Sequence, residues 1–155
     1  MKTATLLAMG MLFAPLLLAD RRHVVADDKV DFAAIKTFSI RQGSAKTTRP
    51  ELNNKLIFKK VEDAIREQLS GKGLTEAQNR PDVVVGFSVG EDRPHGPSVT
   101  CDHGTLVIDM TSRDSNSLIW QGVYTDENST PAKLAEKFPR EAQRLLSQYP
   151  LKKKK

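Results

Sequence analysis

The sequence predicts an α+β fold, a two-layer sandwich in which an antiparallel sheet carries two helices on one face. Three observations predict it. Residues 83–90 alternate between bulky and small side chains, which is the period of a β-strand. Apolar residues recur at helical spacing between Ile57 and Leu69. The expected order of strand, helix, three strands and helix packs most simply when both helices cover one face of one sheet.

The first helix is expected to open at Thr48. Glu51 stands three residues later, which is the spacing of a capping box, and Pro50 is tolerated in a first turn. Gly71 and Gly73 are expected to end the helix, because glycine accepts the left-handed conformation found there. The helix carries an apolar stripe that predicts a core-facing surface, made of Ile57 or Phe58, Val61, Ile65 and Leu69.

Strands are expected on both sides of this helix. Two short ones precede it, over His23–Asp27 and Lys36–Ile40, and the segment 42–48 between them and the helix is polar and expected to be flexible. The next strand begins after Pro81, with one bulky face that should point toward the helices, made of Val83, Val85, Phe87 and Val89.

Residues 104–128 predict a β-hairpin, with Leu106, Ile108 and Met110 on the helix side. A four-residue turn at 114–117 would pair Asp109 with Gly122. Ile119 and Val123 would then face the helices, and the opposite, open face would carry Trp120, Tyr124 and Val107. A slip of one residue would reverse the faces of the second strand.

A second helix is expected after the hairpin. Thr130 is suited to cap it and Pro131 to occupy its first turn. Pro139 lies inside and is expected to kink or divide it, and Pro150 to stop it.

Residues 1–19 predict a secretory signal peptide: Lys2 precedes an uncharged apolar run that ends at Ala19. Cleavage is expected after Ala19, with Ala26 as a second possibility, and a retained anchor is the alternative to cleavage. We therefore expect a periplasmic protein with one α+β domain over residues 20–150. No cysteine lies near the end of the leader, so lipidation is not expected.

The net charge of +5 does not indicate nucleic-acid binding. Lys2 and the tail at 152–155 account for all of it, and residues 3–151 hold 19 basic and 19 acidic side chains. The end of the chain, 151–155, is expected to be a disordered basic tail. The tail residues Lys152, Lys153, Lys154 and Lys155 could give weak contact with an anionic membrane surface, worth about 1 kcal/mol for each lysine.

Two candidate sites emerge, and no cofactor is expected. Trp120, Tyr124 and Val107 would form a recognition patch on the open sheet face, although an aromatic ring that covers glycines is the plainer interpretation of Trp120. The alternative is a metal site or thiol enzyme centred on His95, Cys101 and His103, whose side-chain types bind soft divalent ions. These three residues lack the spacing of a structural zinc site, and no serine lies in a GxSxG motif, so we expect no enzyme.

Several segments in order resemble the bacterial envelope proteins grouped as domain of unknown function 4136. They are KTFSI at 36–40, LSGKG at 69–73, PDVVVGFSV at 81–89, GTLVIDM at 104–110 and LIWQGVY at 118–124, with a closing helix that runs into Tyr149-Pro150. The resemblance implies an exported protein, often a lipoprotein, with no established activity and no catalytic residues to carry over. The missing leader cysteine favours a soluble periplasmic form. There are three function hypotheses. The first is a binding module with an envelope protein or a ligand as its partner, the second is a metal or thiol enzyme, and the third is a structural component of the envelope.

Overall fold

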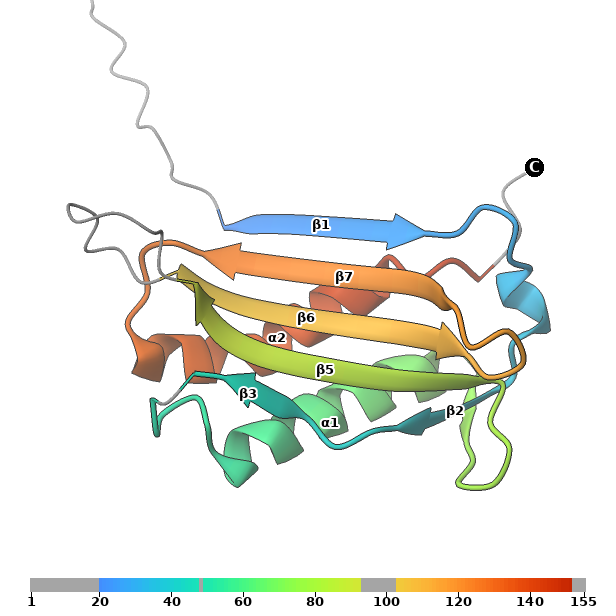
Figure 1. Ribbon diagram of the computed structural model, residues 1–155, viewed down its shortest axis with the longest axis horizontal. Coiled ribbons are helices and arrows are strands. Elements are labelled where there is room, and N and C mark those ends of the chain that lie inside the picture. Colours follow the sequence, from blue (N-terminus) through green and yellow to red (C-terminus); the bar gives the residue numbers. More distant parts are fainter. Residues whose placement is uncertain (1–19, 48, 93–102, 152–155) are drawn as a thin grey trace, which may run out of the picture.

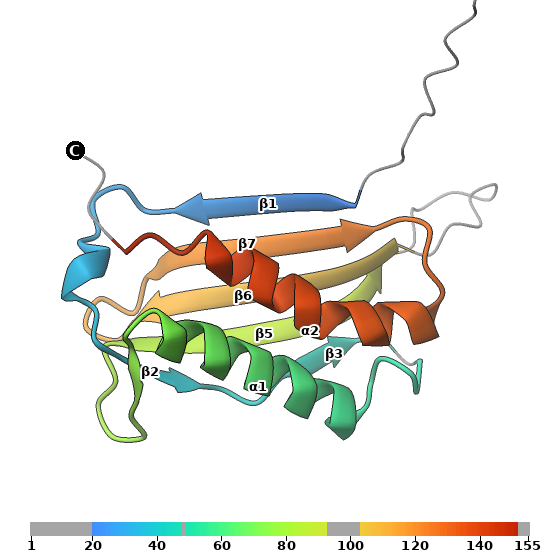
Figure 2. The ribbon, with the colours of Figure 1, turned by 180° about the vertical axis from the view of Figure 1, so that it is seen from behind.

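The computed structural model describes residues 20–47, 49–92 and 103–151, and in them one sheet carries two helices on a single face (Figures 1 and 2). The α+β sandwich with both helices on one side is therefore confirmed. The strands are β1 (Arg21–Ala26), β2 (Thr37–Ile40), β3 (Ser44–Lys46), β4 (Thr75–Glu76), β5 (Val83–Asp92), β6 (His103–Ser112) and β7 (Leu118–Asp126). The helices are a 3₁₀ turn, η1 (Phe32–Ala34), and two long helices, α1 (Lys55–Gly71) and α2 (Pro131–Ser147).

The sheet is mixed, whereas the sequence predicted an antiparallel one. Its order is β1-β7-β6-β5-β2-β4, and β3 also pairs with β5. The β1–β7, β7–β6 and β6–β5 pairs are antiparallel, but β2 and β3 both run parallel to β5. The physical reason is the α1 crossover, which returns the chain to the sheet in its original direction. The segment expected to be polar and flexible thus supplies the edge strand β3.

Helix α1 starts later than the capping-box pattern predicts. Asn54 is its N-cap and accepts a hydrogen bond from the Leu56 backbone N–H at 2.8 Å. The preceding residues form a turn in which the N–H groups of Leu52 and Asn53 donate to the Arg49 carbonyl. This turn buries Leu52 completely, so the chain gains core contact before the helix begins. The end of α1 is as predicted, with Gly73 in the left-handed region at φ +87°.

Helix α2 is capped as expected. The Thr130 side chain accepts a hydrogen bond from the Lys133 N–H, and Pro131 occupies the first turn. Pro139 lies inside the helix but does not divide it, because the helix continues unbroken to Ser147.

The core lies between the sheet and the two helices. The predicted inward face of β5 is confirmed, since Val83, Val85, Phe87 and Val89 are all buried. Leu106, Ile108 and Met110 of β6 join them, as predicted. Helix α1 contributes Ile57, Val61, Ile65 and Leu69, and helix α2 contributes Leu134, Phe138, Leu145 and Leu146. Among the described residues, no helix combines the length and the apolar character needed to cross a membrane.

The predicted faces of β7 are wrong. Asp109 pairs with Gln121 and not with Gly122, and a register irregularity lies between Met110 and Thr111. This one-residue shift turns Trp120 and Tyr124 toward the helices, where they are 1% and 0% exposed, and leaves Val123 on the open face. The irregularity also allows consecutive residues, Ile119 and Trp120, to be buried together.

Candidate functional site: a groove on the open sheet face

The face of the sheet opposite the helices carries a groove of about 530 Å³. Its floor runs across three neighbouring strands, from Gly86 of β5 to Asp109 of β6 and Gln121 of β7, which pair in register. Ser88 and Thr111 flank this row, and Leu118 lies at the far end. A groove of this size is in the range of small-molecule sites.

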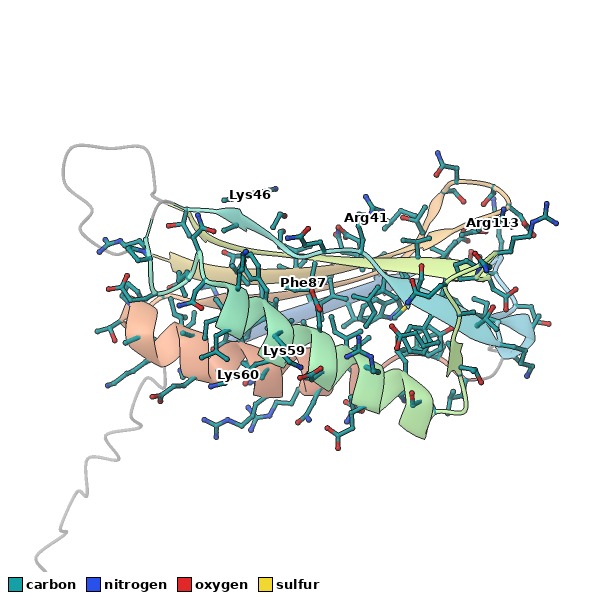
Figure 3. The ribbon with its side chains drawn as sticks, turned by 90° about the horizontal axis from the view of Figure 1, so that it is seen from below. Arg41, Lys46, Lys59, Lys60, Phe87 and Arg113 are labelled. Atoms are coloured by element: carbon teal, nitrogen blue, oxygen red, sulfur yellow. The ribbon has the colours of Figure 1, made fainter. Side chains whose placement is uncertain are left out.

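One wall of the groove comes from the segment that joins β2 to β3. Both strands pair with β5, at Val83–Val85 and Ser88–Gly90, so the edge breaks at residues 41–43. Gly43 permits this close passage, since a Cβ there would stand 2.1 Å from the Phe87 ring. Arg41 and Lys46 therefore rise on the open side of the sheet while Phe87 points toward α1 (Figure 3).

The two cations of this wall are exposed and form no ion pair with any described residue. Lys46 sits over Gly90, where an added Cβ would come within 3.3 Å of the lysine Cβ. Asp109 is the carboxylate in the floor. Its Oδ1 accepts a hydrogen bond of 2.7 Å from Gln121 Nε2. The groove thus combines positive charge at one side with a hydrogen-bonded carboxylate across the floor.

Gly86 has no structural reason to be glycine. It pairs with Asp109 inside a continuous β5–β6 register, so it marks no bulge. Its φ is not in the left-handed region, and no atom lies within 4 Å of the position its Cβ would take. A glycine in a strand interior is destabilising, and it often marks close approach of a ligand. Here it keeps the groove floor open.

The predicted recognition patch does not form a surface. Val107 lies on the open face, half-buried between Ser88 and Val123. Trp120 and Tyr124 lie on the other side of the sheet within the core, where Trp120 packs edge-on against Tyr149 and Tyr124 against Phe138. The plainer interpretation of Trp120, a ring on the open face that covers glycines, is met only in part: the ring covers Gly122, where an added Cβ would lie 2.7 Å from Trp120 Cη2, but it does so on the helix side of the sheet.

The metal or thiol candidate falls mostly outside the described residues. His95 and Cys101 are not among them, and His103 is placed only as the first residue of β6, paired with Asp92. The part of the chain that the structure describes contains no group of three histidine, cysteine, aspartate or glutamate side chains that could hold a metal ion. Lys152–Lys155 also lie outside the described residues.

A second cluster of ionisable groups is buried beside helix α2. Asp126 accepts hydrogen bonds from Lys137 Nζ at 2.6 Å, from the Tyr124 hydroxyl at 3.0 Å, and from the backbone N–H groups of Asn128 and Ser129. Burial opposes its charge, but these donors outweigh burial and hold its pKa well below the usual range. Burial and the Asp126 carboxylate raise the pKa of Tyr124.

Glu141 has an equivalent arrangement nearby. It is 3% exposed and forms ion pairs with Arg22 of β1 and Arg144 of α2, at 2.5 and 2.7 Å. The Arg22 guanidinium also lies over the Tyr124 ring. Because every buried charge in the two clusters is paired, we interpret them as the connection that holds β1 and β7 to α2. Burial raises the pKa of Tyr149, at the end of this helix, to about 12.

The groove residues Arg41, Lys46, Asp109 and Gln121 were not predicted as a site. The available signal was the small face of β5, in which Gly86, Ser88 and Gly90 alternate with large residues. The wall was not visible in the sequence, because it depends on the parallel pairing of β3 with β5.

Solved structures with the same fold come from several bacteria. A DUF4136 family protein from Bacteroides thetaiotaomicron has a TM-score of 0.64 at 14% identity, with 87% of this chain and 98% of that chain covered. A PDZ domain protein from Parabacteroides distasonis has a TM-score of 0.60 at 16% identity, with 87% and 37% covered. A PelC dodecamer from Paraburkholderia phytofirmans has a TM-score of 0.54 at 12% identity, with 88% and 100% covered. At these identities the likeness shows the fold alone.

The family itself follows from the sequence. A search of curated proteins found no match. The model of DUF4136, a domain of unknown function, matches residues 23–151, which includes every strand and helix except the first two residues of β1. The resemblance seen in the sequence is thereby confirmed, and this chain belongs to the DUF4136 family.

Proposed function

We propose that this chain is exported to the bacterial cell envelope and acts there as a non-catalytic binding module through the open face of its sheet. The observation that carries the proposal is the contrast between the two faces. Both helices and all the large aromatic rings of the sheet lie on the side of the core. The opposite face of the sheet holds a polar groove with Arg41 and Lys46 along one wall. Binding sites lie typically in such concave regions.

Export is supported by the leader and by the position of β1. Cleavage after Ala19 would leave β1 complete, since it begins at Arg21. Cleavage after Ala26 would remove the whole strand and with it Arg22, leaving the buried Glu141 with Arg144 as its ion-pair partner among the described residues. We therefore expect the mature chain to start at Asp20.

Two measurements test the proposal. Mass spectrometry of the chain recovered from the periplasmic fraction should give an N-terminus at Asp20. Capture from envelope extracts should succeed with wild type and with Lys60→Glu on the outer face of α1, and fail with Val107→Glu in the open face. Lys60→Glu exchanges an exposed cation for a carboxylate, which is a larger change of charge than Val107→Glu makes, so loss of capture by Val107→Glu alone would not be an effect of added negative charge. If the native mass of the same preparation is that of a dimer, the partner is a second copy of this chain.

The proposal is contradicted if the full-length chain with its leader stays in the cytoplasm. It is equally contradicted if Lys60→Glu abolishes capture while Val107→Glu captures as well as wild type. Circular dichroism checks that the Val107→Glu variant is folded.

A further inference from the structure

We propose that the open-face groove binds a small carboxylic acid, a ligand with a carboxylate at one end and an ammonium or hydroxyl donor at the other. This inference rests on the proposed function, because it names the ligand class of the same face. Three features of the groove support it: its wall, its floor and its free space.

The wall of the groove would bind the carboxylate end of the ligand. Arg41 and Lys46 stand on the same side of the groove and make no ion pair with a described residue. Two cations near helix α2, Arg22 on Glu141 and Lys137 on Asp126, are by contrast held in ion pairs within the fold. An arginine fork matches the two oxygens of a carboxylate, and the lysine adds a second charge.

The floor of the groove would accept a hydrogen bond from the donor end of the ligand. Asp109 Oδ1 is occupied by Gln121, and Oδ2 accepts no hydrogen bond from a described residue. Asp109 lies on β6, two strands away from the edge of the sheet, which is a backbone separation of about 10 Å across the strands. Arg41 stands near this row, since its N–H donates to Val85, whereas Lys46 lies opposite Gly90, four residues further along β5 than Gly86, the partner of Asp109. Long side chains on the wall shorten the gap to the length of a small molecule. The Asp109 carboxylate would repel a purely anionic ligand, whereas an ammonium or hydroxyl group would donate a hydrogen bond to its Oδ2 atom.

The free space lies over Gly86. No atom approaches within 4 Å of the position where a side chain would begin, so the ligand can lie directly on the strand. The hydroxyl groups of Ser88 and Thr111 border this space and are suited to a polar ligand. The groove of about 530 Å³ accommodates a molecule of amino-acid to dipeptide size.

The test is a calorimetric titration of the full chain, at neutral pH, with three probes. L-Glutamate carries carboxylates and an ammonium group, glutarate carries the same carboxylates without the ammonium, and inorganic phosphate carries charge alone. We expect saturable binding in the order glutamate, glutarate, phosphate. Arg41→Ala with Lys46→Ala should weaken glutamate binding at least about tenfold. Asp109→Asn should remove the preference for glutamate over glutarate.

Two further variants separate binding from folding. Gly86→Val fills the floor at a position with room for it, and valine favours strands, so this variant should fold and lose binding of every probe. Lys60→Ala, which removes an exposed cation from α1, should bind as wild type does.

The inference is overturned if no probe binds saturably, if Lys60→Ala weakens binding as much as the wall variants, or if phosphate binds as well as glutamate. These outcomes are distinguishable from failure of the proposed function. Capture that depends on Val107, without binding of any probe, removes the ligand class and leaves the binding module intact.

Discussion

Replacing Asp126 by alanine is expected to lower the free energy of unfolding by about 3–5 kcal/mol, the loss found when one partner of a buried ion pair is removed. Asp126 is 1% exposed and is the acceptor for Lys137, for the Tyr124 hydroxyl and for two backbone N–H groups. Alanine would leave all four donors without their acceptor. Tyr124 is fully buried, so its hydroxyl could not turn to solvent.

Urea unfolding followed by circular dichroism measures this loss. Asp63→Ala is the control, because Asp63 is likewise an ion-paired aspartate, with Lys59 and Arg66, but on the exposed surface of α1. Surface pairs contribute little to stability, so the control should unfold close to wild type. Equal losses in the two variants would contradict the assignment of Asp126 as the buried acceptor.

The same carboxylate predicts a direction for the effect of pH. Its folded pKa lies below the ordinary aspartate value, so its contribution to stability is fully present above that value, about 3.9, and is lost as the pH falls toward the folded pKa. Between pH 7 and pH 3, wild type should therefore lose more stability than Asp126→Asn, and the two unfolding curves should converge on acidification. Divergence on acidification would contradict the lowered pKa.

The second large effect is expected from Trp120→Ala, which should cost about 3–5 kcal/mol of stability. Trp120 is 1% exposed, packs against the Tyr149 ring and covers Gly122. Removing the indole leaves a cavity between β7 and α2. A recognition residue on the open face would give the opposite result, an intact fold with lost binding.

Thermal and urea unfolding compare this variant with Val107→Ala, which removes a half-buried side chain from the open face and should cost about 1 kcal/mol or less. Because Trp120 is the single tryptophan of the chain, wild-type fluorescence also reports its burial through a red shift on unfolding. Wild-type stability of Trp120→Ala would contradict the placement of this ring in the core.

Elements whose faces differ clearly in polarity were predictable from the sequence. On β5, large and small side chains alternate, so Val83 and Val85 were placed correctly toward the helices. Thr130 with Pro131, and Gly71 with Gly73, are local signals for helix ends that need no distant contact.

Elements that depend on distant pairing were not predictable. On β7 both faces carry apolar residues, so alternation does not decide between Ile119 and Trp120, and the irregularity after Met110 sets the register. The capping pattern at Thr48 was overruled by burial of Leu52 in the turn before α1. The groove depends on β3, which precedes α1 and finds its parallel partner β5 only after the α1 crossover has returned the chain to the sheet.

We propose that this domain binds its partner through the open face of its sheet, and site-specific photo-crosslinking in the envelope distinguishes this face from the helices. The reactive residue is placed at Ser88 or Thr111 in the groove, and at Lys60 or Arg140 on the outer surfaces of the helices. The structure predicts adducts from the two groove positions and none from the two helix positions. Adducts that form from the helix positions alone would contradict the claim.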